Sequence, residues 1–440
     1  MVAGDHASAS VGTRSAVIVD GVRTPFARSF GAFGASDALG LFCRAVDGLV
    51  RRVDAPPDAY DEIRCGVVTP QPKNPNVARD TVIALGLPSR IHGTSVNRMC
   101  ASSLETIAEA ARSIHTGDAR LVIAGGVDVL SDVPISYSRP ARRELLRIRK
   151  ARSAWGRAAA FGRFTFRALT PKPPSVTEPL TGMSMGEHAE AMARRHGIGR
   201  AAQDEFALRS HRLAATAAAR GVFAAEIVPV WPEPGYEPCI DADDVIRADA
   251  SLDALARLKP SFDKTHGTVT AGNASPLTDG AAVVVVADEA FARGLGLRPK
   301  ARIRDTVFVG VDPFDELLIG PAIAIPVLLD RHRLAIADID RFEIHEAFAA
   351  QVLSCLEALE SPTFGVRHLS RSGAYGTIPL DRVNVNGGAI AIGHPFGATG
   401  ARLVLTLADE LRRCGGRYGV IAICAAGGMA GAMLVESFPP

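Results

Sequence analysis

Residues 100–126 read CASSLETIAEAARSIHTGDARLVIAGG, and this stretch decides the fold. Its apolar residues recur at i, i+3, i+4 and i+7, which predicts an amphipathic helix over residues 101–115. Gly117 ends the helix, and residues 120–124, which are apolar after Arg120, predict a buried strand that closes on Gly125-Gly126. A helix that leads directly into a buried strand is typical of an α/β protein.

A second stretch, residues 394–428, repeats this layout as HPFGATGARLVLTLADELRRCGGRYGVIAICAAGG. Val404, Leu407 and Leu411 share one face of a predicted helix, glycines end it, and residues 418–423 predict a strand before another glycine pair. Two such units indicate an internal duplication, with βαβ crossovers and a largely parallel sheet under helices. Further strands are predicted at residues 16–19, 281–287 and 301–304.

The repeat divides the chain into a short tail, two halves and an insertion. The predicted parts are a disordered tail (1–14), an N-terminal half (15–126 and 251–290), an inserted loop domain (127–250) and a C-terminal half (291–440). The first residues lack a long apolar run, which argues against a signal peptide. The chain also lacks a stretch of about 18 uninterrupted apolar residues, so we expect no transmembrane helix.

The composition is that of a soluble globular protein, with 440 residues, 47% hydrophobic and 22% charged. A net charge of +2 argues against nucleic-acid binding. The seven cysteines include no Cys-x-x-Cys pair and no tight Cys/His cluster, so neither a zinc site nor a disulfide framework is indicated. A reducing, cytoplasmic location fits this cysteine usage.

The segment 139–172 is strongly basic, and Glu144 is its only acidic residue. A solvated surface is the ordinary interpretation of such a run of charges. Apolar residues, including Leu145, Trp155 and Phe161, are interleaved with the arginines. This pattern favours contact with an anionic membrane surface or an acidic partner.

Four residues are candidates for chemistry: Cys100, His345, His394 and Cys424. Cys100 lies at the start of a helix, where unpaired N–H groups and the helix dipole are expected to lower the pKa of its thiol. Taken alone, each residue has a structural interpretation, because most cysteines are small core residues and a lone histidine is usually a hydrogen-bonded core residue. Together they are predicted to lie at the carboxyl ends of strands, where α/β sheets bind ligands.

These motifs together resemble the thiolase superfamily, from about Ala16 to Glu436. The similarity is greatest to the degradative 3-ketoacyl-CoA thiolases (acetyl-CoA C-acyltransferases) of the β-subunit type, found in the fatty-acid oxidation trifunctional complex. The motifs are Arg23-Thr24-Pro25-Phe26, Asn76 to Arg79, the Cys100 segment, Met185-Gly186-Glu187, Gln203-Asp204-Glu205, Gly267 to Ser275, His345 to Phe348, Gly393-His394-Pro395 and Cys424 to Gly428. The resemblance implies an α/β thiolase fold, with two similar βαβ-type halves in a five-layered α-β-α-β-α arrangement and an inserted loop domain.

The resemblance also implies a role for each candidate. Cys100 attacks the 3-keto carbon, and His394 takes the proton of its thiol. Cys424 protonates the acetyl-CoA enolate and later deprotonates the incoming CoA. One oxyanion site consists of the backbone N–H groups of Cys100 and Ala426. The other consists of His394 and a water held by residue 345.

His345 departs from the pattern of many thiolases, which have Asn at this position, but the β-subunit type shares the histidine. It either holds the water or donates directly. The resemblance further assigns Ser275, Arg247 and Met185 to CoA binding. Coenzyme A is expected as a substrate, with no permanently bound cofactor and no metal.

The sequence leaves several alternatives open. One is an acetoacetyl-CoA thiolase that works in synthesis. Another is a catalytically silent carrier of lipid or CoA, which needs none of the four candidate residues, and a third is a membrane or complex scaffold. Expected partners are acyl-CoA and CoA, further copies in a homodimer or tetramer, and a hydratase/dehydrogenase α-subunit, but no nucleic acid.

Overall fold

The computed structural model describes residues 14–162, 170 and 177–438. Most of the predicted tail, and the part of the basic segment beyond residue 162 apart from residue 170, lie outside the described residues. Each helix among the described residues is either too short or too polar to span a bilayer.

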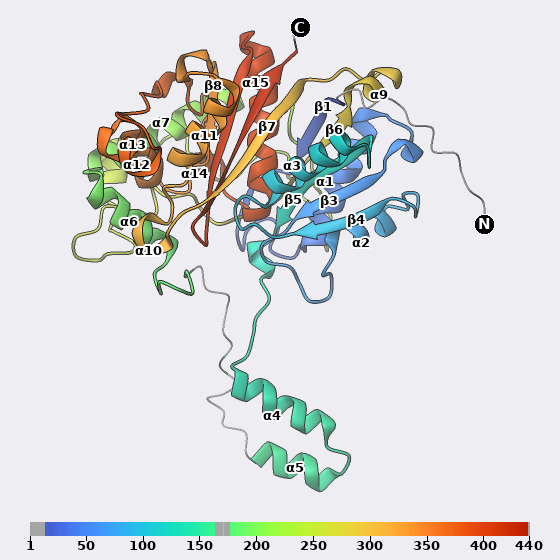
Figure 1. The fold of residues 1–440 in the computed structure, drawn as a ribbon. Helices are drawn as coiled ribbons and strands as arrows, with labels where there is room; N and C mark the ends of the chain where they lie inside the picture. The colour runs from blue at the N-terminus through green and yellow to red at the C-terminus, as the bar shows by residue number, and fades with distance from the viewer. Residues whose placement is uncertain (1–13, 163–169, 171–176, 439–440) are drawn as a thin grey trace.

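The strands form one sheet in which two half-sheets meet edge to edge (Figure 1). The order across the sheet is β4-β3-β5-β6-β1-β7-β10-β9-β8, and β2 pairs with β6. The halves join where β1 meets β7, through Val17 with Arg302 and Ile18 with Ala301. The strands are β1 (Ala16–Arg23), β2 (Ala27–Arg28), β3 (Glu62–Gly66), β4 (His92–Val96), β5 (Leu121–Asp128), β6 (Thr278–Asp288), β7 (Ala301–Gly310), β8 (Arg341–Ile344), β9 (Tyr418–Ala425) and β10 (Met429–Ser437).

The prediction of a largely parallel sheet is wrong. Only β3–β4, β3–β5 and β8–β9 are parallel among the described strand pairs. The pairs β5–β6, β1–β6, β1–β7, β7–β10 and β9–β10 are antiparallel. The repeated helix–strand unit does give a parallel pair in each half, but the strands that follow it return antiparallel along the same sheet.

Helices cover the outer face of each half-sheet. Further helices form a central layer between the inner faces of the two half-sheets (Figure 1). The helices are α1 (Ala38–Val53), α2 (Val77–Ala84), α3 (Ser102–Thr116), α4 (Arg139–Lys150), α5 (Ala154–Gly162), α6 (Met185–Arg195), α7 (Arg200–Ala219), α8 (Leu252–Ala256), α9 (Glu289–Gly294), α10 (Pro313–Glu316), α11 (Pro321–His332), α12 (Ala349–Glu360), α13 (Pro362–His368), α14 (Ala389–Ile392) and α15 (Thr399–Cys414). Short 3-10 turns lie at η1 (Pro57–Ala59), η2 (Leu130–Asp132), η4 (Ile336–Asp338), η5 (Leu380–Arg382) and η6 (Phe396–Ala398).

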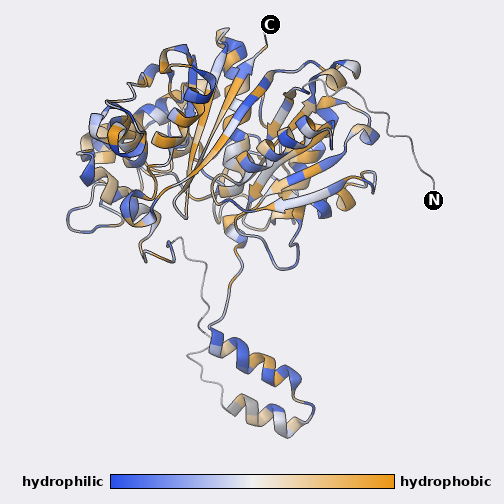
Figure 2. Ribbon diagram, in the orientation of Figure 1, coloured by the Kyte–Doolittle hydropathy of each residue, from blue (hydrophilic) through white to orange (hydrophobic). Residues whose placement is uncertain are grey.

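The five layers follow from the alternation of side chains along each strand. On β6, Val283 and Val285 pack against α1, whereas Val284 and Val286 face the central layer of α3 and α15. On β9, residues 421 and 423 face that same central layer, while residues 420 and 422 pack on the side of α11 and α12. Both faces of these strands are therefore buried, and Figure 2 shows hydrophobic residues concentrated on them. The five-layered arrangement is confirmed.

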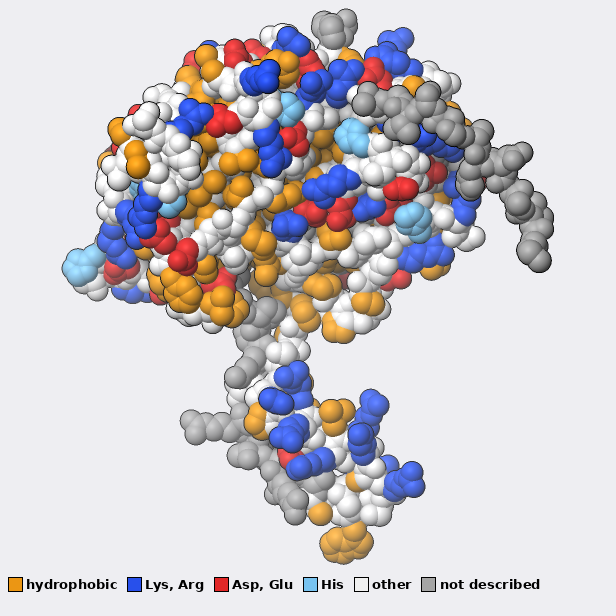
Figure 3. Space-filling view, in the orientation of Figure 1, with side chains coloured by type: hydrophobic (Ala, Val, Ile, Leu, Met, Phe, Trp, Pro, Cys, Tyr) orange, Lys and Arg blue, Asp and Glu red, His pale blue; other side chains and the backbone are white. Residues whose placement is uncertain are grey.

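Helices α4 and α5 form a helical hairpin that extends away from the body of the molecule (Figure 1). Lys and Arg side chains dominate its surface in Figure 3. Large apolar side chains are also exposed on it, with Trp155 at 87%, Phe161 at 64% and Leu146 at 52%. The hairpin contributes little to the hydrophobic core, because Ala141 is the only α4 residue that is buried.

Candidate active site

Cys100 is presented by a tight turn between β4 and α3. The backbone of Met99 is left-handed, with φ of 48°, which is uncommon for a residue with a side chain. Ser102 holds the turn, because its Oγ accepts from the Arg98 N–H at 2.8 Å and donates to the Met99 carbonyl at 2.6 Å. Such a strained backbone persists only where its surroundings enforce it, and it places Cys100 directly before Ala101, the N-cap residue of α3.

The environment of Cys100 raises the pKa of its thiol to about 12. Burial of the sulfur is the main cause, and it outweighs the hydrogen bond that the backbone N–H of Ala426 directs at the sulfur. The expectation of a lowered pKa at the helix start is therefore wrong. At neutral pH the group is a thiol, and it needs a base before it can act as a nucleophile.

His394 is a buried histidine that can act as this base. Its Nδ1 lies 2.6 Å from the Oγ1 of Thr399, and that hydroxyl donates its single hydrogen to the Pro395 carbonyl at 3.0 Å. The Thr399 oxygen therefore accepts from the Nδ1–H of His394, which leaves Nε2 as a free acceptor. Burial lowers the pKa of His394 to about 3, assisted by the positive charge of Arg402, so the ring is neutral at physiological pH.

The predicted position of His394 at the end of a strand is wrong. It lies between α14 and η6, directly after Gly393, whose φ is 106°. A side chain at Gly393 would come within 2.6 Å of Thr278 on β6. This close approach of the backbone to the sheet brings the histidine into the site from a loop.

His345 directly follows β8 and stacks beside His394, with ring centroids 4.1 Å apart and an angle of 49° between the planes. It is fully buried, and neither ring nitrogen has a hydrogen-bond partner among the described residues. Burial lowers its pKa well below the ordinary value, with contributions from His394 and Arg402. A buried neutral ring with two unused nitrogens is suited to hold a water or a substrate oxygen.

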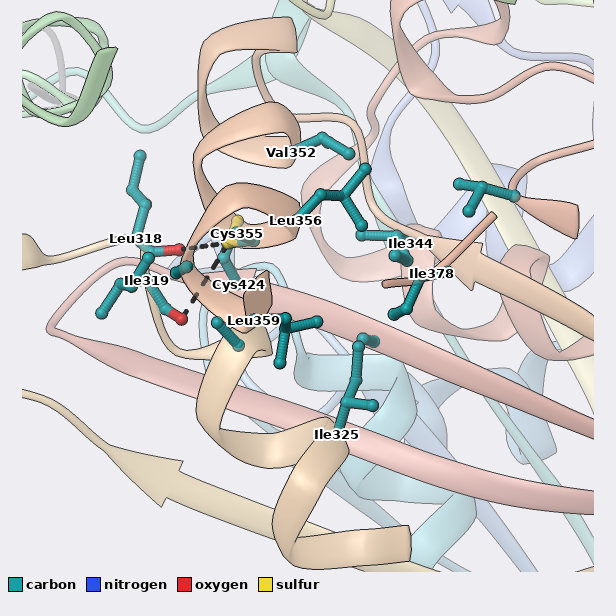
Figure 4. Packing of buried hydrophobic residues seen from close by; sticks show 14 of the residues in the cluster. Leu318, Ile319, Ile325, Ile344, Val352, Cys355, Leu356, Leu359, Ile378 and Cys424 are labelled. Atoms are coloured by element: carbon teal, nitrogen blue, oxygen red, sulfur yellow. Dashed lines mark hydrogen bonds between the residues drawn. The ribbon is translucent and has the colours of Figure 1, made fainter. Parts of the chain in front are cut away.

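Cys424 lies near the end of β9 and is 1% exposed. Burial raises the pKa of its thiol, and the proximity of Cys100 raises it further. In Figure 4, Cys424 lies in the apolar cluster around α12 together with a third thiol, Cys355. Cys355 donates to the Leu318 and Ile319 carbonyls at 3.7 and 3.9 Å, which gives it a structural role that the sequence pattern did not reveal.

Asp128, at the end of β5, joins the Cys100 side of the site to the His394 loop. Its carboxylate accepts from the N–H of Val68, from the N–H and hydroxyl of Thr69, and from the N–H of Gly397 at 2.6 Å. Burial raises its pKa to about 6, and its four hydrogen bonds oppose this shift. The sequence analysis missed this residue, because an acidic side chain after a strand carries no distinct signal.

Glu346 joins the His345 segment to the loop before His394. It accepts from the Ser210 hydroxyl and the Asn384 amide, each at 2.7 Å, and from the Ile390 N–H at 3.2 Å. A side chain at Gly388 would come within 2.2 Å of its carboxyl group. This close contact explains Gly388, while Gly387 has a positive φ of 79° and would place a side chain within 2.7 Å of Ala214.

Of the three predicted CoA residues, only Arg247 lines the cavity described next. A cavity of about 250 Å³ is lined by Arg247, together with Arg28, His211 and Pro276, the neighbour of Ser275. Neither Ser275 nor Met185 is part of its described lining. The Ser275 hydroxyl donates to the Ala347 carbonyl at 3.1 Å, next to the His345 segment, and Met185 begins α6 against the core.

Comparison with known proteins agrees with this geometry. Residues 16–290 match the family model "Thiolase, N-terminal domain", and residues 297–437 match "Thiolase, C-terminal domain". The chain belongs to the thiolase family. No group of three or more metal-ligating side chains that could hold an ion occurs within the described residues of this thiolase.

Several named proteins are similar to this thiolase over nearly its whole length. The 3-ketoacyl-CoA thiolase of Serratia proteamaculans (strain 568) is 43% identical over 419 residues, covering 95% of this chain and 96% of that protein. The probable 3-ketoacyl-CoA thiolase of Caenorhabditis elegans is 43% identical, with 96% and 94% covered. The crystal structure of the Bacillus anthracis acetyl-CoA acetyltransferase superimposes with a TM-score of 0.85 at 33% identity, covering 98% of this chain and 100% of that chain.

Proposed function

We propose that this thiolase cleaves 3-ketoacyl-CoA with coenzyme A, giving acetyl-CoA and an acyl-CoA shortened by two carbons, in fatty-acid β-oxidation. The observation that carries the proposal is that the Cys100 segment and the His394 loop meet in one place. The Gly397 N–H of that loop donates to Asp128 at 2.6 Å, and the Ala401 N–H donates to the Ser103 hydroxyl, three residues after Cys100, at 2.9 Å. An acyltransferase needs its thiol and its base in one place, whereas a silent carrier does not. The relatives named as 3-ketoacyl-CoA thiolases support the same substrate class.

In the first half-reaction, the Nε2 of His394 takes the proton of the Cys100 thiol, and the sulfur attacks the 3-keto carbon. The C2–C3 bond then breaks, so that the acyl chain remains on the sulfur as a thioester. The bonding electrons leave with acetyl-CoA as its enolate. Cys424 supplies the proton that converts the enolate carbon into a methyl group.

In the second half-reaction, the thiolate of Cys424 takes the proton of the incoming CoA thiol. The CoA sulfur attacks the thioester carbon, and Cys100 leaves as a thiolate that recovers its proton from His394. Protons and electrons balance over the cycle, so the chemistry requires no oxidant, reductant or further co-reactant. The enzyme returns to its starting state with both cysteines protonated.

Negative charge develops on two oxygens during these steps, and each needs a donor. The N–H groups of Cys100 and Ala426 serve the oxygen of the carbon attacked by sulfur. The hydrogen bond from the Ala426 N–H to the Cys100 sulfur supports this assignment, since it places the donor beside the reacting atom. His394 serves the enolate oxygen, together with His345 or a water held by His345.

For CoA we propose a path from the cavity at Arg247 towards the thiols. Arg247 and Arg28 offer positive charge for a phosphate. Ser275 lies between this cavity and the His345 segment, through its neighbour Pro276 and its bond to Ala347. Met185 borders the pantetheine arm in this proposal.

The test is a steady-state assay of CoA-dependent cleavage across short and long 3-ketoacyl-CoAs. Cleavage of substrates longer than acetoacetyl-CoA is expected. Activity confined to acetoacetyl-CoA would favour the alternative of an acetyltransferase working in synthesis, and the similar Bacillus anthracis protein is named an acetyl-CoA acetyltransferase. Binding of CoA without turnover would favour a silent carrier.

The acid limb of the pH profile is expected to follow Asp128. Below its pKa of about 6 the carboxylate becomes protonated and can no longer accept from all four donors, including the N–H of Gly397. Loosening the His394 loop should therefore lower kcat as the pH falls through this value. His394 does not contribute to this limb, because its pKa is about 3.

The measurement is kcat against pH for the unaltered enzyme and for Asp128→Asn. The amide has a permanent donor in place of one acceptor oxygen, so this variant should be about tenfold slower near neutral pH and lack the limb near 6. An unchanged acid limb in Asp128→Asn would assign the titration to another group.

We also propose that the helical hairpin α4–α5 lies on an anionic membrane surface. Its exposed arginines supply attraction to the headgroups, and exposed Trp155 and Phe161 supply apolar contact. A hydratase/dehydrogenase α-subunit is the alternative partner of the hairpin. For the protein as a whole, the other proposed partners are acyl-CoA, CoA and further copies of the chain. We further propose that the chain is divided into two halves and an insertion, and that the protein is located in the cytoplasm.

Replacing Arg142, Arg143 and Arg149 by Gln should weaken co-sedimentation with phosphatidylglycerol vesicles by roughly two orders of magnitude, since each charge near the surface contributes about 1 kcal/mol. Binding should also weaken with salt, because exposed charges are screened beyond about 10 Å at 0.1 M. The matched control replaces Arg212, Arg220 and Arg412, which are exposed outside the hairpin. Equal binding by both triple variants would contradict a role for the hairpin, while pull-down of an α-subunit would favour the protein partner.

A further inference from the structure

We propose that Glu178 is a positioning residue that aligns the Ala426 N–H for catalysis. The inference rests on the proposed function, in which that N–H stabilises the oxyanion. Glu178 lies in the segment between the helical hairpin and α6, far in sequence from the catalytic loop at residues 424–428. None of the motifs in the sequence includes it.

The contact is a hydrogen bond from the Gly427 N–H to the Oε2 of Glu178, at 3.0 Å. Glu178 is only 6% exposed, so its carboxyl group is fixed by its surroundings. Its backbone is held as well, because its N–H donates to the Met183 carbonyl at 2.8 Å and its carbonyl accepts from the Gly182 N–H at 2.9 Å. The acceptor is therefore part of a closed turn and not a mobile surface side chain.

The catalytic loop needs such an anchor because it consists of small residues with unusual backbone angles. Gly427 and Gly428 both have positive φ, at 80° and 65°. Beyond Gly428 the loop is fixed by a bond from the Val311 N–H to the Gly428 carbonyl, at 2.7 Å. Glu178 fixes the loop at its centre, between this bond and β9.

Adjacent peptide planes connect the contact to the chemistry. The N–H groups of Ala426 and Gly427 belong to two peptide planes that share the Cα of Ala426. Holding the Gly427 N–H restricts rotation of the second plane, and this restricts the direction of the Ala426 N–H towards the Cys100 sulfur. Donors fixed before the reaction stabilise a developing oxyanion without a reorganisation cost.

The segment also connects two parts of the proposed site. The turn that begins at Glu178 closes on Met183, and Met185 then begins α6. The same short segment thus contacts the oxyanion loop and leads into the proposed pantetheine channel. One structural unit would therefore align both the carbonyl oxygen of the thioester, at the oxyanion loop, and its pantetheine arm.

The test compares Glu178→Met with Glu178→Gln. Methionine has a similar size but cannot accept strongly, whereas glutamine keeps an acceptor oxygen. Glu178→Met is expected to lower kcat about tenfold with KM for CoA within about twofold, since the contact acts in the transition state. Glu178→Gln should recover kcat to within about threefold of the unaltered enzyme.

The matched control is Glu187→Ala in the same segment. It removes the capping box that Glu187 forms with Ser184 at the start of α6, without touching the loop. This variant should lose thermal stability while keeping kcat within about twofold. A merely structural role for the segment would make the control and Glu178→Met alike in both measurements.

Glu178→Met with unchanged kcat, a change confined to KM, or Glu178→Gln as slow as Glu178→Met would each overturn the proposal. Circular dichroism and melting curves identify a variant that fails to fold. If Glu178→Met does so, Glu178→Leu, which also lacks an acceptor, takes its place under the same rate criterion. The acyl adduct on Cys100 is measured separately in the unaltered enzyme. Failure of the proposed chemistry would remove that adduct, whereas failure of the Glu178 role would leave it in place.

Discussion

Cys100→Ala is expected to lower kcat for thiolysis by at least about 10⁴-fold, because removal of a nucleophile leaves only binding and oxyanion stabilisation. The unaltered enzyme, incubated with a 3-ketoacyl-CoA in the absence of free CoA, should gain the mass of the shortened acyl chain. Trypsin separates the two candidate thiols, since cleavage after Arg98 and Arg112 isolates Cys100 and cleavage after Arg417 isolates Cys424. The adduct is expected on the peptide of residues 99–112.

The matched control is Cys414→Ala, which removes an exposed thiol at the end of α15. It should retain the adduct and turn over within about twofold of the unaltered enzyme. An adduct on residues 418–440, or none on either peptide, would contradict the assignment of Cys100. Cys414→Ala, which lacks this exposed thiol, also serves to test the raised pKa of Cys100. Iodoacetamide should label Cys100 slowly at neutral pH when substrate is absent.

The fold was predictable to the extent that periodicity reports local structure. The helix at residues 101–115 and the strand after it were predicted within a few residues of α3 and β5, because burial of one face imposes the 3.6-residue pattern. The direction of the strands was not predictable in this way. The run 281–287 is apolar throughout because both faces of β6 are covered, and this pattern is the same for a parallel or an antiparallel strand.

The catalytic residues were predictable from motifs, but their electrostatics were not. Cys100 lies at the helix start as expected, yet burial outweighs the local N–H groups and raises its pKa. Burial is a tertiary property, and no local pattern reports it. The thiolase family and the 3-ketoacyl-CoA thiolase relatives confirm the resemblance, whereas the domain boundaries and the roles of single residues stay predictions.

Hydrogen bonds between segments that are distant in the sequence could not be predicted, for the same reason. Asp128, Glu178 and Glu346 each accept hydrogen bonds from segments more than 30 residues away. Their signal is a buried carboxylate that meets backbone N–H groups, and this becomes visible only in three dimensions. All three hold glycine-containing or histidine-containing loops. Asp128 and Glu178 lie outside the motifs, and Glu346 lies inside the motif of residues 345–348, which gave no sign of its hydrogen bonds.

His394→Ala and Cys424→Ala are each expected to lower turnover by at least about 10²-fold, the usual scale of general acid–base catalysis. The two variants should fail in different ways, because the residues handle different protons. His394→Ala leaves a thiol whose pKa is about 12 without a base, so both acylation and labelling of Cys100 should slow. Cys424→Ala keeps the His394 base, so labelling of Cys100 should persist while exchange of the acetyl-CoA methyl protons in D₂O is lost.

The pH dependence separates this arrangement from an ordinary histidine. A histidine whose pKa is about 3 stays neutral throughout the range in which the fold is expected to be stable, so the loss in His394→Ala should be the same factor at every pH above about 5. An exposed imidazole near its usual pKa would instead make the loss smaller at lower pH. Cys355→Ser, which keeps a donor for the Leu318 carbonyl beside Cys424, is the matched control and should turn over within about threefold of the unaltered enzyme. A Cys424→Ala enzyme with near-normal turnover would transfer the acid role to another group, and among the buried thiols of this cluster Cys355 would be the one to test next.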